Sequence, residues 1–289
     1  MEVTVVGDVN PDLLYVVDSF PSLDSQSIAR AFQMKLGGSA ANTAYALARL
    51  GAKTWFFGCV GEDDFGRFCE QELKRAGVKA SLCRTRAAST GITSAVEFMG
   101  TRTMFTHRGA NEFLDIHHVT LRGDWMHVSG YWHLTKLRPN IEKLFKQASE
   151  RGMKTSFDVG SWNNDWKESE YIVRAIEKGY VDFVLANAEE ISGLTGLPAE
   201  DAIERLRRKT VIGLHQGRNG ATIYWNEGEH HVPAWEIHPV RTTGAGDTWN
   251  AGFIWAYIQL GDVKRAAEIA MDIVENYVLG KEIEAPVIR

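Results

Sequence analysis

Short apolar runs rich in β-branched residues alternate with amphipathic helical stretches along most of this chain, and glycine often closes an element. The run at 3–6 ends at Gly7, and the helical stretch at 40–50 ends at Gly51, a typical residue just past a helix end. Strands separated by helices predict a mostly parallel sheet with helices on both faces. The expected strands lie at 3–6, 54–60, 125–129, 154–158, 183–186, 210–214 and 221–225, and the expected helices at 40–50, 65–76, 141–151 and after Gly246.

Two segments break this alternation. Residues 13–36 and 91–107 alternate apolar and polar side chains with no helix between close strands, and 91–107 is typical of a hairpin. We expect a small antiparallel sheet that projects from the main sheet as a lid, with segments at about 12–36 and 89–110. An apolar lid face would need cover, so we expect a homodimer formed through the lid. Residues 1–289 are expected to form a single domain, a three-layer α/β/α fold plus this lid.

Composition excludes several classes of function. The net charge of −5 and the lack of a Lys/Arg run disfavour nucleic acid as a partner. No apolar run is long enough for a membrane span, and no signal peptide is evident. The three cysteines, Cys59, Cys69 and Cys83, share no metal-like spacing, so we expect buried free thiols in a reducing compartment. These features predict a cytoplasmic protein with no nucleic-acid or membrane partner.

The segment Thr-Thr-Gly-Ala-Gly-Asp at 242–247 leads into a long helical run. Its glycines let the backbone turn tightly and let an anion approach peptide N–H groups, and a helix N-terminus adds unpaired donors and a positive dipole end. Asp247 would then place a carboxylate beside an anion hole, as transfer of a phosphoryl group to an alcohol requires. An acidic residue in the first turn of a helix is also common without any chemistry, so this segment alone leaves both interpretations open.

Two nucleotide-binding fingerprints are absent from the sequence. Trp249 stands where the dinucleotide motif needs its third glycine, which disfavours an oxidoreductase, and no Gly-x-x-x-x-Gly-Lys-Ser/Thr segment occurs. Parallel sheets bind ligands at the carboxyl ends of their strands. Polar or glycine residues follow the predicted strands at this position: Asp8, Asp158, Asn187 and Gly217.

Several motifs occur in one known order. They are Gly-Asp-Val-Asn-Pro-Asp at 7–12, Gly-Gly-Ser-Ala-Ala-Asn at 37–42, Val-Gly-Glu-Asp-Asp-Phe-Gly at 60–66, Gly-Ala-Asn at 109–111, Asn-Ala-Glu-Glu at 187–190 and Thr-Thr-Gly-Ala-Gly-Asp at 242–247. Together they make the chain resemble the ribokinase-like (PfkB) family of carbohydrate and nucleoside kinases along nearly its whole length. The resemblance implies an ATP- and Mg²⁺-dependent kinase that phosphorylates a hydroxyl of a small sugar or sugar-derived molecule.

The resemblance also implies roles for residues on the nucleotide side. Asp247 corresponds to the base that takes the proton of the acceptor hydroxyl. Asn187 and Glu190 are implied in organising Mg²⁺ and the phosphates, with Glu190 acting on the metal through water, although 187–190 is equally a good helix start. The anion hole corresponds to Gly244, Ala245 and Gly246, and further nucleotide contacts to Thr243, Gly217 and Gly220, of which the last two also fit a plain hairpin turn.

On the acceptor side, the resemblance implies substrate contacts from Asp12, Gly37, Gly38 and Asn42. A carboxylate and an amide bind neighbouring sugar hydroxyls, while glycines let the ring approach closely. Asn42 could instead cap the helix that follows it. Asp8 is expected to close a turn at a strand end rather than to touch substrate.

Further candidate residues lie outside the motif positions that were assigned roles above. Arg108 is predicted to bind a sugar-acid carboxylate or a neutral sugar, and Asp158 to lie near the site, whereas Arg102 is expected on the surface of the hairpin. Sugar faces stack on tryptophan rings, but most tryptophans are core or rim residues. This choice stays open for Trp132, Trp162 and Trp166.

The chain departs from the family pattern at three places. Arg241 stands where an acidic residue commonly helps to hold a monovalent cation, so we expect no potassium site. His-Gln-Gly at 215–217 replaces Thr-Leu-Gly, and the tail after Met271 lacks a clear version of the family's last helix, so Asn276 is expected to be an ordinary helix residue. The alternatives to a sugar kinase are a nucleoside kinase, then a sugar-phosphate kinase with Arg108 as its one evident basic residue, and a non-catalytic binding module.

Overall fold

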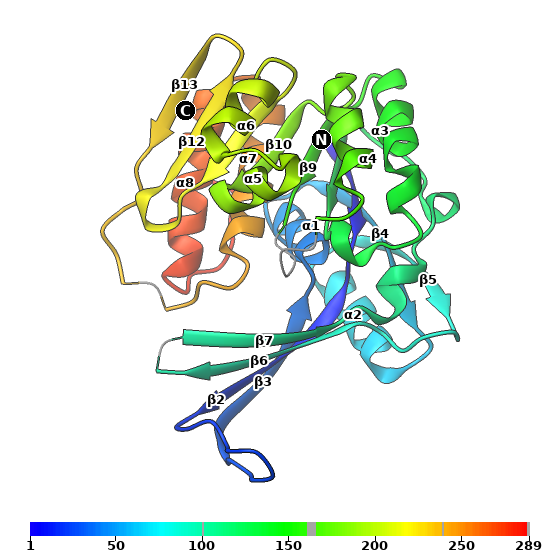
Figure 1. Ribbon diagram of the computed structural model, residues 1–289, viewed down its shortest axis with the longest axis vertical. Helices are drawn as coiled ribbons and strands as arrows, with labels where there is room; N and C mark the ends of the chain where they lie inside the picture. The colour runs from blue at the N-terminus through cyan, green and yellow to red at the C-terminus, as the bar shows by residue number, and fades with distance from the viewer. Residues whose placement is uncertain (100, 161–165, 239, 288–289) are drawn as a thin grey trace.

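The computed structural model describes residues 1–99, 101–160, 166–238 and 240–287. A nine-stranded sheet runs through the body in the order β13-β12-β11-β10-β9-β8-β1-β4-β5 (Figure 1). Its strands are β1 (Glu2–Gly7), β4 (Lys53–Gly61), β5 (Lys79–Thr85), β8 (Trp125–Ser129), β9 (Lys154–Asp158), β10 (Phe183–Asn187), β11 (Val211–His215), β12 (Ala221–Trp225) and β13 (Gly228–Val232). Neighbours from β11 to β5 are parallel, and only the β12 and β13 edge is antiparallel. The mostly parallel sheet predicted from the sequence is confirmed.

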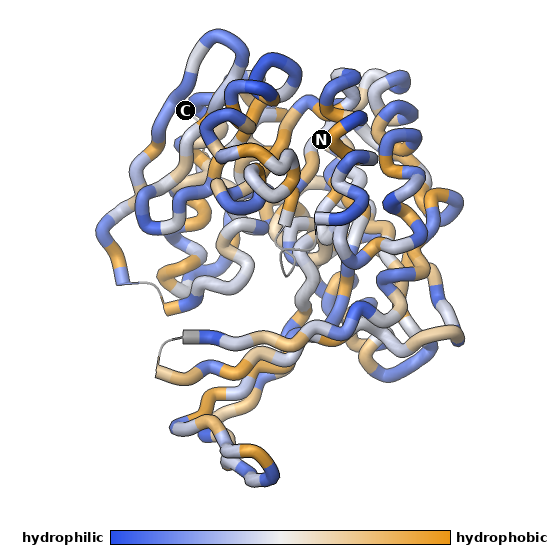
Figure 2. The backbone as a smooth tube through the Cα atoms, viewed as in Figure 1, coloured by the Kyte–Doolittle hydropathy of each residue, from blue (hydrophilic) through white to orange (hydrophobic). Residues whose placement is uncertain are grey.

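Helices cover both faces of this sheet. Alternate residues of a strand point to opposite faces, so Val3 and Val5 of β1 join one core, while Val6 joins the other. Figure 2 shows hydrophobic stretches gathered inside the body. The first core lies under α1 (Ser39–Arg49), α2 (Asp64–Arg75), α7 (Ala245–Leu260) and α8 (Val263–Val278), and the second under α3 (Ile141–Glu150), α4 (Ser169–Glu177), α5 (Ala188–Thr195) and α6 (Ala199–Leu206). The expected three-layer α/β/α fold is confirmed.

A second, four-stranded sheet with the order β3-β2-β6-β7 projects from the body (Figure 1), and we call it the lid. The predicted hairpin is confirmed, since β6 pairs antiparallel with β7. The expectation of a purely antiparallel lid is wrong, because β2 pairs parallel with β6. Both of these strands leave the body, so they run the same way. The strands of the lid are β2 (Asn10–Val17), β3 (Ala29–Gly37), β6 (Ile92–Phe98) and β7 (Thr101–His107).

The cysteines differ from the expectation. Cys59 on β4 and Cys83 on β5 form a disulfide, and Cys69 on α2 is buried and free. The two bonded residues lie directly opposite each other in the β4–β5 pair, with Cα atoms 4.5 Å apart. Their separation of 24 residues along the chain gives no sign of this pairing. The expectation of free thiols therefore holds for Cys69 alone.

The remaining elements complete the body. Helix α8 spans Val263–Val278 with Asn276 inside it, and the described residues at 281–287 form no further helix. None of the described helices has both the length and the hydrophobicity needed to cross a bilayer. Short 3-10 helices lie at Gly109–Phe113, Ile116–His118, Tyr131–His133, Arg138–Asn140 and Gly217–Asn219.

Candidate active site

The carboxyl ends of several parallel strands carry polar side chains near the N-terminus of α7. Asp8 directly follows β1, and Asp158, Asn187 and His215 are the last residues of β9, β10 and β11. Burial and the charge of Asp158 together raise the pKa of Asp247, so strand end and helix start lie within electrostatic reach of each other. This is the edge at which parallel α/β sheets bind ligands.

A tight turn at 242–245 leads into α7. Gly244 is the N-cap residue and has φ of +76°, a conformation that glycine adopts without strain. The N–H of Ala245 donates to the carbonyl oxygen of Thr242 at 3.2 Å. The helix then begins at Ala245, and the first N–H groups of a helix have no partner inside it. Residues 244–246 therefore have the backbone arrangement that an anion hole needs.

Asp247 is the third residue of α7, and it is fixed from another helix. The side-chain amide of Asn42 on α1 donates a hydrogen bond to its carboxylate at 2.9 Å. The alternative in which Asn42 caps α1 is wrong, because the N-cap of that helix is Gly38 and Asn42 lies inside it. Asp247 likewise makes no capping bond in α7. Its carboxylate is thus held beside the turn at 244–246 and does not cap the N-terminus of α7.

Carboxyl groups near this point have raised pKa values. Burial raises the pKa of Asp247 well above its ordinary value, Asp158 adds to the effect, and the Asn42 amide opposes it. Burial raises the pKa of Asp158 to about 6, although Ser129 donates a hydrogen bond to it at 2.6 Å. Burial and the neighbouring Asp158 raise the pKa of Glu190 to about 7. A cation bound among these groups would favour their ionised forms.

Asn187 and Glu190 cap the start of α5 reciprocally. The Asn187 side-chain oxygen accepts from the Glu190 N–H at 2.9 Å, and the Glu190 carboxylate accepts from the Asn187 N–H at 2.8 Å. The helix-start interpretation is therefore confirmed, and the same bonds hold Glu190 in place at the strand end. Within the described residues, no group of three or more His, Cys, Asp and Glu side chains could hold a metal ion.

Asp12, a predicted substrate contact, lies where the lid joins the body. Asp12 on β2 accepts a hydrogen bond from the Asn10 amide at 3.0 Å. Burial raises the pKa of Asp12 to about 6, and Asp8 adds to the effect. A Cβ on Gly37 would meet Asp12 Oδ1 at 2.0 Å, so glycine at this position makes room for the carboxylate.

Asp8, expected to close a turn at the end of β1, bonds the N-terminus of α1 instead, 32 residues further along the chain. Its carboxylate accepts from the Ala40 N–H at 3.0 Å, and its carbonyl oxygen accepts from the Ala41 N–H at 3.2 Å. Gly38 beside it has φ of +92°, and a Cβ there would meet the Asp8 carbonyl oxygen at 2.7 Å. The backbone conformation at the start of α1 therefore requires glycine at position 38, independently of the predicted substrate contact.

Arg102 is not the surface residue that the sequence suggested. From β7 it donates hydrogen bonds to the side-chain hydroxyls of Thr243 and of Thr242, the latter at 3.0 Å. Its Nε is buried and has no hydrogen-bond partner among the described residues, and its charge lowers the pKa of Asp12. The lid thus brings a guanidinium to the turn that precedes the anion hole. No sequence pattern indicated a contact between residues 140 positions apart.

The other predicted residues are placed as follows. Arg108 at the base of the lid lies 3.7 Å from Glu112 in an ion pair. The hairpin interpretation of Gly217 and Gly220 is confirmed, since they connect antiparallel strands β11 and β12 and Gly220 accepts from Gln216 N–H at 2.9 Å.

The tryptophans favour the packing interpretation. The indole of Trp132 is buried and donates to the carbonyl oxygens of Val159 and Gly160 at 2.8 and 3.1 Å. Trp166 packs edge-on against it with ring centres 5.1 Å apart. Trp162 lies outside the described residues.

Sequence reasoning missed two residues behind the anion hole. His215 is half-buried, the burial of its ring lowers its pKa to about 4, and the ring contacts the ring of Trp249 with centres 4.9 Å apart. A Cβ on Gly246 would lie 3.8 Å from His215 Nδ1. Asn250, buried on α7, lowers the pKa of Asp158 and raises that of His215, so its amide lies between the two strand ends. The sequence signal for His215 was its departure from the family's Thr-Leu-Gly pattern, whereas no sequence pattern indicated Asn250.

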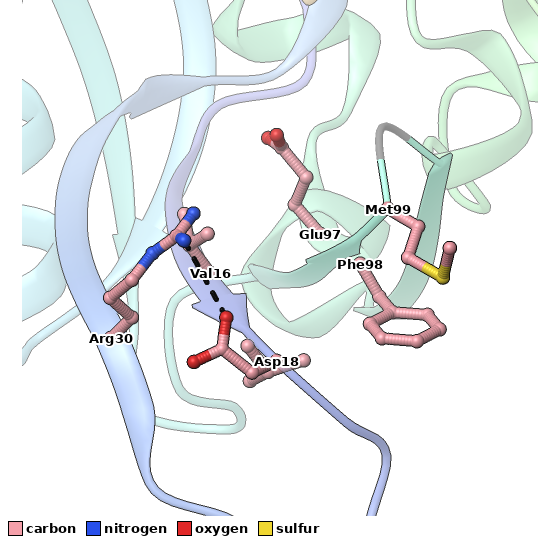
Figure 3. A pocket seen from close by; sticks show the side chains of 7 residues that line it. Val16, Asp18, Arg30, Glu97, Phe98 and Met99 are labelled. Carbon is pink, nitrogen blue, oxygen red and sulfur yellow. Dashed lines mark ion pairs between the residues drawn. The ribbon is translucent and has the colours of Figure 1, made fainter.

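A cavity of about 280 Å³ lies at the outer end of the lid, away from these residues. Figure 3 shows it between Val16, Glu97 and Phe98, with an exposed ion pair from Arg30 to Asp18 at 3.5 Å. It contains none of the strand-end carboxylates and no part of the turn at 242–246. The arrangement suited to phosphoryl transfer is therefore the one at the start of α7.

Comparison with known proteins agrees with this geometry. A family model described as pfkB family carbohydrate kinase matches residues 1–273. The chain belongs to this family. It is 31% identical to an ATP-dependent ribose-1-phosphate kinase of Halopiger xanaduensis, with 93% of this chain and 89% of the relative covered. It is 27% identical to a deoxyribokinase of Salmonella typhi, with 97% and 94% covered.

Solved structures confirm the fold. The nucleoside kinase of Methanocaldococcus jannaschii, a member of the ribokinase family, superposes with a TM-score of 0.81 at 22% identity and covers 98% of this chain and 95% of its own. The ribokinase-like fold and the small separate sheet expected from the sequence are both present. The protein is a carbohydrate kinase, a phosphotransferase that acts on a hydroxyl group of a sugar-like substrate with ATP as donor.

Proposed function

We propose that this kinase transfers the γ-phosphoryl group of ATP to a hydroxyl of a small sugar or sugar-derived acceptor, with Asp247 as the base. The observation that carries the proposal is the hydrogen bond from Asn42 to Asp247 at 2.9 Å, beside the N-terminus of α7. It leaves a carboxylate held at the lip of an anion-binding turn. The whole chain then works as one kinase domain, with the acceptor between the lid and the body.

The proposed step is a direct transfer from ATP to the acceptor, with no covalent enzyme intermediate. The acceptor oxygen forms a bond to the γ-phosphorus, the bond from that phosphorus to the bridging oxygen of ADP breaks, and the hydroxyl proton goes to Asp247. Backbone N–H groups of 244–246 and the positive end of α7 stabilise the charge on the transferred group. Because positioning matters in such a loose transition state, the hydrogen bond from Asn42 is needed to hold the Asp247 carboxylate where it can take the hydroxyl proton.

The residues present fit Mg²⁺ bound mostly through water and phosphate. Asp158 and Glu190 are buried carboxylates, and burial raises the pKa of both, with the charge of Asp158 adding to the effect at Glu190. Asn187 and Glu190 would hold the hydrated ion, which prefers oxygen ligands and retains several waters. When bound, Mg²⁺ would neutralise the phosphate charge. The nucleotide contacts proposed for Thr243, Gly217 and Gly220 complete this side of the site.

Two acceptor classes deserve separate tests. Asp12, Asn42, Asp158 and the glycines at 37–38 suit sugar hydroxyls. A sugar phosphate is the second candidate, because Arg102 adds a guanidinium to the Arg108 that the sequence offered. The relative that phosphorylates ribose 1-phosphate points the same way. A nucleoside acceptor is the third candidate.

The experiment is a screen for ADP release from Mg-ATP with purified protein. The acceptors are D-ribose, 2-deoxy-D-ribose, D-fructose, ribose 1-phosphate and adenosine. We expect turnover on a sugar or a sugar phosphate and little on adenosine. Turnover on adenosine alone would replace the sugar proposal by the nucleoside one, and no turnover on any acceptor by folded protein would contradict the proposed acceptor class.

A further inference from the structure

We propose that Arg241 is a tethered cation that holds the segment leading to the anion hole, and so acts as a positioning residue in phosphoryl transfer. The inference rests on the proposed function and extends it to a residue outside the predicted contacts. The sequence predicted only that Arg241 disfavours a potassium site; the structure shows what its guanidinium contacts.

The guanidinium of Arg241 is held at the C-terminal end of α8. Its Nε donates to the carbonyl oxygen of Tyr277 at 2.6 Å, and its Nη2 donates to the carbonyl oxygen of Lys281. Its central carbon lies 3.8 Å from the centre of the Tyr277 ring, which is cation–π distance. In the described part of the chain no acidic side chain forms an ion pair with Arg241, so carbonyl oxygens and a ring face balance its charge.

The end of a helix is a favourable place for a cation. The last carbonyl groups of a helix lack partners inside it and carry the negative end of its dipole. Helix α8 ends at Val278, whose carbonyl oxygen accepts from the N–H groups of Val240 and Arg241 at 2.9 and 3.2 Å. The backbone segments 240–241 and 277–281 therefore meet here, and the Arg241 guanidinium bonds the first to the second.

Tyr277 links Arg241 to the turn that forms the proposed anion hole. The hydroxyl of Tyr277 donates to the carbonyl oxygen of Thr243 at 2.7 Å, and a Cβ on Gly244 would lie 3.1 Å from that hydroxyl. Burial raises the pKa of Tyr277, Arg241 lowers it, and Asp247 raises it, so all three groups are within electrostatic reach. Arg241 thus holds the ring whose hydroxyl fixes the residue before the anion hole. Displacing that turn would misplace its N–H groups.

The first test is Arg241→Ala with and without millimolar guanidinium ion, which fits the space left by the side chain. With the best acceptor of the panel above, we expect kcat to fall about 100-fold, the loss typical of a 1 Å misplacement, with a smaller change in the acceptor KM. Guanidinium should restore much of kcat. Arg265→Ala is the matched control, since Arg265 lies on α8 and pairs with exposed Glu268.

The second readout needs no turnover. Amide hydrogen exchange at 242–247 should become faster in Arg241→Ala and slow again with guanidinium, while the strands of the sheet keep their protection. If Arg241→Ala does not fold, Arg241→Lys replaces it and should show an intermediate effect, because an ammonium cannot donate to both carbonyl oxygens as a guanidinium does. Unchanged turnover and exchange, or a loss that guanidinium does not reverse, would overturn the proposal. If no acceptor gives turnover, the proposed function fails while exchange still decides the role of Arg241.

Discussion

At the scale of single residues, the site is a set of acids held close together. Asp158 ends β9, and its negative charge raises the pKa of both Asp247 and Glu190. Each carboxylate has a neutral donor of its own: the Asn42 amide for Asp247, the Ser129 hydroxyl for Asp158 and the Asn187 N–H for Glu190. These donors position the acids but leave their charges uncompensated. Cations that arrive with the nucleotide are the natural complement.

This crowding predicts the pH dependence of the reaction. The base must be ionised, so kcat/KM should fall as pH drops through the pKa of Asp247, at a pH above that of an ordinary aspartate. Asp158→Asn removes a neighbouring negative charge, which lowers the pKa of Asp247 and should move this acidic limb to lower pH. The profile is measured alongside Glu150→Gln on the exposed face of α3. An acidic limb that stays in place in Asp158→Asn would contradict the electrostatic coupling.

At the scale of elements, the lid and the turn before α7 are coupled by Arg102. The residue lies on β7, yet its guanidinium bonds the hydroxyls of Thr242 and Thr243. The lid therefore takes part in ordering the turn, in addition to its proposed role of covering the acceptor. Its buried Nε, unpartnered among the described residues, could donate to an anionic group of a bound substrate.

Removing this link should slow the enzyme. Arg102→Ala should lower kcat/KM about 10- to 100-fold, the range for a charged hydrogen bond, and the loss should be larger for ribose 1-phosphate than for ribose. Arg30→Ala at the lid tip is the control, since its exposed ion pair with Asp18 contributes little. Equal kinetics for the two variants would show that Arg102 does not act in the site.

The elements also show how far the sequence could lead. Strand and helix periods are local, so β1, β4, β8 to β12 and the helices α1, α2, α3 and α7 followed from residue order, whereas β5, β13, α6 and α8 were missed. The motifs at 37–42, 187–190 and 242–247 are contiguous, so their clustering followed from the strand-end rule. What stayed hidden depends on contacts between distant segments, namely the Cys59–Cys83 bond, the parallel pairing of β2 with β6, and Arg102 on the turn.

At the scale of the whole molecule, one face of the lid is apolar and exposed. Residues directly opposite in neighbouring strands share a face, which groups Leu13 with Met34 and Tyr15 with Phe32. Phe105 joins them through Ser94, which is opposite both Leu13 and Phe105. Phe32 is 55% and Phe105 66% exposed. Asp12 and Arg102 lie on the other face, so the apolar face is free to pair with a second copy.

We expect a homodimer through this face. Light scattering at micromolar protein should give twice the chain mass, and Phe32→Glu should give the monomer because it places a charge in the apolar contact. Val287→Glu, which changes an exposed apolar residue on the body, should leave the dimer intact. A monomeric wild type under these conditions would contradict the expectation.

The central claim is that Asp247 is the base of a kinase, and Asp247→Asn tests it most directly. The measurement pairs ADP release from Mg-ATP with calorimetric binding of the acceptor. We predict that turnover falls about 1,000-fold or more, within the range for losing a positioned base, while acceptor affinity changes only a few-fold because the side chain keeps its size. Turnover equal to that of the wild type in a folded variant would contradict the account.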